Sequence, residues 1–540
     1  MRHIATGLLL STLLAACGDS NAPLTAAVPP LPLPPMAPAT CTPQAMQLTG
    51  EVGVPGDTLY LPFDMPGGHE RMEALFDVGS PATKLGLGVF DQRGTGFQNN
   101  GFRGITGEER REFFIASDEA TPGFTAGALQ AGRWTLVVPN FLNASGTAVV
   151  AVKLLCGTAK ATPQPLPQLE RVRDEAGWYA GDLHVHSHFS SDANASGSAL
   201  TPRGLAERAQ AMGLDFIAIT DHNVTAQNRR LSADTVPGFL LLGGEEVTTW
   251  VAGPGHLVVA GLDENEHVDW RFRPVNGRYQ RTATWKPDDR PIQDVLAYTR
   301  ARGLFATAAH PYVAPGLGSD WGFFPDSDQD VDALPDALEV WNDSFTVTSG
   351  DITLRQWDTE LARNRHLCGN GGSDLHGVDR GIEVGQPATV VFADALSRAA
   401  VIDALRHCRV YITTDATTGP ALLLSAATAG GEPQMMGGTV TGATTDLVTV
   451  SARVTGGAGA TLTLIQNGLP ILTTTIAGDD STVTQMTLLG SGGAVRAELR
   501  ASPGALAPLA LSNPVFLRNG LVPAPIDLRL AAAQRLLLQR

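Results

Sequence analysis

The sequence predicts a multi-domain protein in which a central α/β domain lies between two all-β domains. Three observations support this prediction. The chain has 540 residues and is 43% apolar, which is enough for about three globular domains. Between residues 175 and 419, apolar strand-like runs alternate with helix-like segments, a pattern typical of α/β folds. On either side of this stretch, short β-branched runs are separated by turns rich in Gly and Pro.

Changes in composition divide the chain into six segments. The expected segments are a signal with an anchor cysteine (1–17), a Pro-rich tether (18–43), a β-sandwich domain (44–157), a linker (158–174), the α/β domain (175–419) and an Ig-like β-sandwich domain with a helical tail (420–540).

The first residues are typical of an export signal. Two basic-type residues, Arg2 and His3, precede an apolar stretch at 4–14 that is too short to span a bilayer. The run that ends at Cys17 (LAAC) resembles the bacterial lipoprotein signal, in which cleavage precedes the cysteine and acyl chains are attached to it. We therefore expect a lipid-anchored protein of the periplasm or cell surface, with an ordinary secretory signal as the alternative. The seven Pro of residues 21–40 then form a stiff tether.

Compact strand-like runs indicate the two β domains. The runs at 134–138 and 148–152 belong to the first domain, and those at 447–450 and 461–464 belong to the last. Both domains could bind a ligand, but packing against the central domain is the simpler interpretation. An amphipathic helix is expected at 526–540.

Five cysteines fit an oxidising compartment. With Cys17 lipidated, four remain, and four cysteines allow three pairings. Cys41 and Cys156 bracket the first β domain, whereas Cys368 and Cys408 both lie late in the central domain. We therefore expect the disulfides Cys41–Cys156 and Cys368–Cys408.

Within the central domain, the helix signals and strand runs follow one another in order. A helix is expected at 201–213, with Thr201 as N-cap and Pro202 at its first position. Strands are expected at 214–220, 239–242, 304–309 and 338–341. Repeated βα units predict a parallel sheet with helices outside, and in closed parallel barrels the chemistry lies at the carboxyl ends of the strands.

Nine residues of the types that ligate metals lie at the start of these predicted strands or directly after them. In a strand, residues i and i+2 share a face, so neighbouring ligands of this spacing project side by side. So many imidazoles and carboxylates cannot be buried together without cations. The nine are His184, His186, Asp192, His222, Glu246, His256, His310, Asp374 and His376.

The order of these motifs (HxH, SD, DH, GxE, H, HP and SDxH) resembles the PHP (polymerase and histidinol phosphatase) superfamily. The phrase GWYAGDLHVHSHFSSD is similar, more narrowly, to the bacterial carbaryl-hydrolase-like branch. The resemblance covers roughly residues 175–420. It implies a distorted seven-stranded (β/α)7 barrel that holds two or three divalent metals. The implied ligand sets are His184, His186, Glu246 and Asp374 for the first metal, Glu246, His256 and His310 for the second, and Asp192, His222 and His376 for the third.

Such a site would make a hydrolase that needs no serine or cysteine nucleophile. Glu246 would bridge two metals together with a hydroxide, and Asp374 would accept the proton during attack. Three metals, three carboxylates and one hydroxide leave a charge of about +2, which suits an anionic phosphoester. The carbaryl-hydrolase likeness instead favours a carboxylic or carbamic ester, and a non-catalytic surface binding protein that keeps its metals for structure is a third reading. Zn, Mn and Fe all suit these ligands.

The charge balance excludes one class of partner. The chain carries a net charge of −16. Nucleic-acid phosphates require cationic surfaces, so we expect a small-molecule substrate and no nucleic acid. Contact with a membrane is expected through the lipid anchor only.

Overall fold

The computed structural model describes most of the chain after residue 40. The described residues are 41–53, 57–77, 85–107, 110–140, 146–158, 160–195, 197–248, 255–273, 290–312, 321, 334–345, 350–379 and 381–520. The described residues from Cys41 onward belong to one compact unit. The expected signal, its Cys17, nearly all of the tether and the tail helix at 526–540 lie outside the described residues. Within the described part of the chain, no helix is long and apolar enough to cross a membrane.

The first β region contains two four-stranded antiparallel sheets, ordered β1-β8-β3-β6 and β2-β7-β4-β5. Apolar residues of both sheets, such as Val150 and Trp134, share one buried core. Cys41 and Cys156, at the two ends of this region, form a disulfide with an S–S distance of 1.97 Å. The strands are β1 (Gln44–Val52), β2 (Thr58–Met65), β3 (Arg71–Phe76), β4 (Gly88–Phe90), β5 (Phe102–Ile105), β6 (Glu112–Ala116), β7 (Gly132–Pro139) and β8 (Gly146–Leu155).

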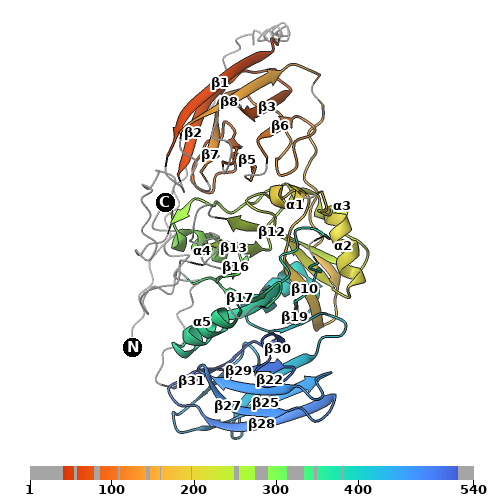
Figure 1. Cartoon of the computed structure of the whole chain (residues 1–540), viewed down its shortest axis with the longest axis vertical. Helices are drawn as coiled ribbons and strands as arrows, with labels where there is room; N and C mark the ends of the chain where they lie inside the picture. The colour runs from red at the N-terminus through yellow and green to blue at the C-terminus, as the bar shows by residue number, and fades with distance from the viewer. Residues whose placement is uncertain are drawn as a thin grey trace, which may run out of the picture. The chain divides into compact units, whose positions relative to one another are not determined.

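The central region alternates strands with helices, as expected (Figure 1). The strands are β9 (Arg171–Arg173), β10 (Gly177–Val185), β11 (Phe216–Ile219), β12 (Leu240–Thr248), β13 (His256–Ala260), β14 (Phe272–Arg273), β15 (Arg290–Pro291), β16 (Phe305–Ala309), β17 (Ala337–Asn342), β18 (Cys368–Gly372), β19 (Ala388–Ala393), β20 (Leu396–Ser397) and β21 (Val410–Thr413). The helices are α1 (Ser191–Ala195), α2 (Pro202–Ala211), the 3-10 helix η1 (Ala226–Arg230), α3 (Leu231–Asp234), α4 (Ile292–Ala301), α5 (Gly350–Ala362) and α6 (Arg398–Arg406).

The helix signals predicted α2 well. The Thr201 hydroxyl accepts a hydrogen bond from the Gly204 amide at 3.1 Å, and Pro202 occupies the first turn, where its missing N–H costs nothing. Leu205 and Ala209 are buried, and Met212, which forms the C-cap, is partly buried against the same core cluster. The expected strands at 214–220, 239–242, 304–309 and 338–341 correspond to β11, β12, β16 and β17.

The expectation of a parallel sheet holds for two groups of strands and is wrong for β13. Strands β10, β11 and β12 are parallel, and so are β16, β17 and β18, but β13 between them is antiparallel to both of its neighbours. The reason is the short connection at 249–255, because a parallel crossover needs a dozen or more residues. Since β13 runs in reverse, its first residue, His256, lies at the edge where the parallel strands end.

Backbone contacts also join the two ends of this strand order, β18-β17-β16-β13-β12-β11-β10. An isolated parallel bridge pairs Val185 with Leu375. On either side of it, the His186 amide donates to Leu375 O and the Asp374 amide donates to His184 O, both at 2.9 Å. The segment after β18 is therefore held beside the end of β10. The seven-stranded barrel stays a prediction.

The last β region continues the central sheet. Strand β21 pairs with β30, so the order extends through β19-β21-β30-β29-β26-β27, and a second sheet has the order β23-β22-β25-β28. Leu422 and Val450 of this sheet share a core with Leu464 and Leu499 of the extended one. The strands are β22 (Ala421–Thr428), β23 (Gln434–Met435), β24 (Thr439–Gly442), β25 (Leu447–Thr455), β26 (Thr461–Gln466), β27 (Leu469–Thr475), β28 (Asp480–Leu488), β29 (Gly493–Arg500), β30 (Pro508–Ser512) and β31 (Val515–Asn519).

The side chain of Trp357 packs helix α5 against strand β18. This side chain is fully buried, and its indole N–H donates to Leu367 O at 2.9 Å. The backbone of β18 lies against the ring at Gly369, where an added Cβ would come within 2.9 Å of the indole. The indole thus supports the strand that leads directly to Asp374.

We expect Trp357→Ala to lower the free energy of unfolding by about 3–5 kcal/mol, because it leaves a cavity beneath β18. Ile352→Ala, on the same helix but 36% exposed, should cost less than about 1 kcal/mol. Urea denaturation followed by circular dichroism measures both values. Equal losses for the two variants would show that the indole is not a core support.

Candidate metal centre

The side chain of Glu246 is the centre of the candidate site. It is fully buried at the end region of β12, and its two oxygens face different groups of histidines. Oε2 lies 3.1 Å from His184 Nε2, 3.2 Å from His186 Nε2 and 3.1 Å from His222 Nδ1. Oε1 lies 2.6 Å from His256 Nδ1 and 3.1 Å from His310 Nε2. One carboxylate therefore touches five imidazoles.

The neighbouring Glu245 points away from this cluster. It lies on the opposite face of β12, because side chains alternate along a strand. One of its oxygens accepts the Val268 amide at 2.7 Å. Glu246, the glutamate of the GxE motif, is therefore the one of the two that faces the histidines.

The first ligand group contains His184, His186, Glu246 and Asp374. Their ligand atoms all lie within 4.8 Å of one another. Asp374 Oδ1 is 3.2 Å from His184 Nε2 and 3.1 Å from His186 Nε2. The two histidines come from the end of β10, and Asp374 follows β18, where the Val185–Leu375 bridge holds the two segments together. This set is the one implied for the first metal.

The second group overlaps the set implied for the second metal and also includes His222. His222, Glu246 and His256 have ligand atoms within 4.8 Å of one another. His310, expected in this set, contacts the same Glu246 oxygen as His256, with its Nε2 3.1 Å from Oε1. His222 joins the group because its Nδ1 faces Glu246 while its Nε2 faces Asp192.

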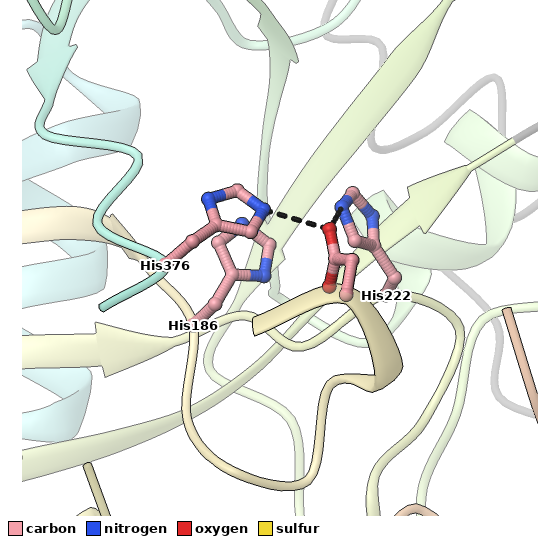
Figure 2. A group of neighbouring side chains, drawn as sticks. His186, His222 and His376 are labelled. Atoms are coloured by element: carbon pink, nitrogen blue, oxygen red, sulfur yellow. Dashed lines mark ion pairs between the residues drawn. The ribbon is translucent and has the colours of Figure 1, made fainter. Parts of the chain in front are cut away.

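The third group gathers around Asp192. Its Oδ2 lies 3.1 Å from His222 Nε2 and 2.9 Å from His376 Nε2. His186 belongs to this group as well as to the first, and its ring lies 3.9 Å from that of His376 between centroids. Figure 2 shows the three imidazoles around the carboxylate, with dashed lines to His222 and His376. The sharing of His186 was not expected from the sequence.

A pair of buried ligand atoms without a hydrogen-bond partner indicates that a cation fits this arrangement. His184 Nε2 and Glu246 Oε2 are buried and make no hydrogen bond of suitable geometry among the described residues, although they face each other. A buried ligand atom without a partner costs several kcal/mol unless an ion or a hydrogen bond satisfies it. In addition, His310 and Asp374 have positive φ angles of 29° and 54°, strained conformations that cluster at functional sites.

The charges of the cluster shift the pKa values of its members strongly. Burial alone would raise the pKa of Glu246, but His222 and His184 hold the pKa of that carboxyl well below its usual range. Burial alone would lower the pKa of His184, but Asp374 and Glu339 raise it well above its usual range. The pKa of His222 rises to about 10 for the same kind of reason. Divalent cations would take over the neutralising role of the protons on these imidazoles.

The sequence interpretation missed several buried partners of the ligands. Glu339 accepts from His184, and the Thr248 hydroxyl lies 2.6 Å from His222 Nδ1. Asp182 Oδ1 accepts the amides of His184 and Ser373, both at 3.1 Å, and so ties β10 to the segment after β18. The sequence carried one signal for Glu339, because it is a charged residue inside the apolar run ALEVWN. A charge buried in such a strand is costly unless a partner neutralises it.

The third histidine of the run HVHSHF and the cysteines of the predicted disulfides do not belong to the cluster. This histidine, His188, belongs to none of the ligand groups, and its ring packs on Phe189 at 4.3 Å between centroids. Cys368 and Cys408 form a disulfide with an S–S distance of 1.96 Å. Both disulfides predicted from the sequence are therefore confirmed.

No family model matches the chain, and no curated protein is similar to it. Among solved structures, one similar chain is an amidohydrolase from Chromobacterium violaceum, determined with bound sulfate and no metal. Its identity to this chain is 16% and the TM-score is 0.24, over 38% of this chain and 89% of that chain. A similarity of this size defines neither the fold nor the activity of this chain.

Removal of divalent ions should destabilise the protein. Ligands that bind only the folded state stabilise it by about 4 kcal/mol when present at 1,000 times their dissociation constant. We expect dialysis against a chelator to lower the thermal unfolding midpoint by several degrees, and Zn²⁺ or Mn²⁺ to restore it. Ca²⁺ is the matched control, because imidazole ligands favour transition metals. Identical midpoints with and without chelator would contradict a metal centre.

Proposed function

We propose that this protein is a metal-dependent hydrolase of the PHP superfamily, most similar to its carbaryl-hydrolase-like branch, and that it acts as a phosphoesterase. The observation that carries the proposal is the contact of one buried carboxylate, Glu246, with five imidazoles. We further propose that the strands from β10 to β18 form the distorted seven-stranded barrel of that superfamily, flanked by two sandwich domains.

The nine residues would hold two or three divalent ions. Zn, Mn and Fe all suit imidazole and carboxylate ligands. When bound, such ions activate water and polarise the oxygens of the scissile group. The imidazoles and carboxylates of these residues would supply the ligand atoms for the ions.

Two carboxylates of the site suit different roles. Glu246 is fully buried, so it is suited to hold ions in place. Asp374 has a side chain that is 21% exposed, so it can meet both a bound substrate and solvent. Its Oδ1 faces His184 and His186, two of the three histidines that Glu246 Oε2 faces. Asp374 is therefore the residue that we propose as proton acceptor.

The charge of the loaded site favours an anionic substrate. Three divalent ions against three ligand carboxylates and one hydroxide leave about +2. An anionic phosphoester compensates this charge better than a neutral ester does. The resemblance to carbaryl hydrolase favours the second candidate, a carboxylic or carbamic ester hydrolase with the same residues.

We expect the purified, zinc- or manganese-loaded protein to hydrolyse a chromogenic phosphoester faster than a naphthyl ester. Asp374→Asn should lower kcat by about 10²–10⁴-fold, because it removes the proton acceptor. His186→Ala should abolish turnover, since it takes part in two ligand groups. His188→Ala is the matched control, a histidine of the same stretch that should keep activity within about twofold.

Other outcomes would reject particular parts of this proposal. Turnover of the naphthyl ester alone would replace phosphoesterase by ester hydrolase. Equal rates for wild type and His186→Ala would mean that the metals, if bound, serve structure only, as in a surface binding protein.

We also propose that the protein is exported and lipid-anchored through Cys17. The motif before Cys17 and the two disulfides support this proposal, because disulfides persist in oxidising compartments. In a bacterial host, labelled palmitate should be incorporated into the wild type and not into Cys17→Ser, and the variant should shift to the soluble fraction. Incorporation into both proteins would contradict an anchor at this residue.

A further inference from the structure

We propose that Glu339 is a positioning residue that fixes which nitrogen of His184 faces the metal centre and holds His310 beside it. The proposal rests on the proposed metal centre and goes beyond it, because Glu339 is not among the nine ligands. Glu339 lies in the middle of β17, is 2% exposed, and has both of its oxygens in hydrogen bonds.

The first part of the evidence is the orientation of His184. Its Nδ1 lies 3.0 and 3.3 Å from the two oxygens of Glu339. Its other nitrogen, Nε2, faces Glu246 and Asp374 at 3.1 and 3.2 Å. A neutral imidazole carries one N–H, and a carboxylate at Nδ1 keeps that proton there. The lone pair of Nε2 is then directed into the ligand group.

The same carboxylate also holds a second ligand, His310. The His310 amide donates to Glu339 Oε2 at 2.8 Å. This hydrogen bond fixes the backbone at a residue with a positive φ of 29°, a conformation that is unfavourable for a residue with a Cβ. The His310 ring in turn reaches Glu246 Oε1 at 3.1 Å. Glu339 thus connects a ligand near the end of β10 with a ligand that follows β16.

The surroundings of Glu339 make this role specific. Besides His184 and His310, it accepts from the Asn342 side-chain amide at 3.0 Å, so three donors converge on two oxygens. The contact also requires a glycine at position 372 in β18. An added Cβ there would overlap the Glu339 carboxylate and come within 2.5 Å of His184 Cβ.

The geometry predicts what an amide at this position would do. In Glu339→Gln, one oxygen can still accept from His310 and Asn342, but the NH₂ group then faces His184 Nδ1. A donor facing Nδ1 favours the other tautomer, in which the proton sits on Nε2 and blocks metal ligation there. In Glu339→Asp, the charge remains but the shorter side chain cannot reach both partners.

The test measures metal affinity in the full-length protein. The metal-free wild type, Glu339→Gln and Glu339→Asp are titrated with Zn²⁺ in competition with a chromogenic chelator. Loss of an outer partner of a metal-binding histidine typically costs about 10–100-fold in affinity. We expect a loss of that size for at least one ion in both variants. Glu245→Gln is the matched control, because Glu245 is as buried but faces away from the ligands; it should bind Zn²⁺ like the wild type.

Each result decides a different question. Wild-type affinity in Glu339→Asp would show that Glu339 acts by its charge and not by position, and wild-type affinity in Glu339→Gln would show that it has no role; either overturns the inference. If the wild type itself binds no Zn²⁺ or Mn²⁺, the proposed function fails and not only this inference.

A second pair of variants covers the case in which the Glu339 variants do not fold. Gly372→Ala pushes a methyl group between Glu339 and His184, whereas Gly371→Ala pushes one against Ile412 and Pro387 on the other face of β18. We expect weaker Zn²⁺ binding in Gly372→Ala only. Equal affinities in these two variants would overturn the inference.

Discussion

The burial of Glu246 among five imidazoles is the constraint on which the site depends. A carboxylate without solvent must be neutralised by partners that surround it. The partners come from the ends of β10, β11 and β16 and from the start of β13, so these strands must all meet at one edge. Because one carboxylate must contact all five imidazoles, the four strands that carry them are fixed in position relative to one another.

The reversal of β13 is how the chain meets this requirement with a short connection. Strand β12 carries Glu246 near its end at Thr248, and β13 begins soon afterwards in the chain, at His256. The antiparallel β13 begins with His256 only 2.6 Å from the Glu246 carboxylate. A parallel strand in this place would need a long crossover before it delivered its histidine. Behind the ligands, Asp182 and Glu339 fix backbone and ring orientations, so the site has an inner layer that faces the proposed ions and an outer layer that holds it.

Much of the site could be predicted because its residues stand at strand ends in a fixed order. The pairing of His184 with His186 and the neighbourhood of Asp374 follow from local spacing. The double use of His186 and His222 could not be predicted, because it depends on ring orientations in space. Glu339 was missed because it lies inside an apolar run and its partners are 155 and 29 residues away in the chain.

By itself, the sequence determined the order of strands and helices, the cap of α2 and the identity of the candidate ligands, because these depend on residues close together in the chain. Only the tertiary structure decided the direction of β13, the pairing of the segment after β18 with β10, and which oxygen of Glu246 faces which histidines. Strand direction and pairing are settled by long-range hydrogen bonds and by the satisfaction of buried charge. These terms involve residues far apart in sequence, so no local pattern encodes them.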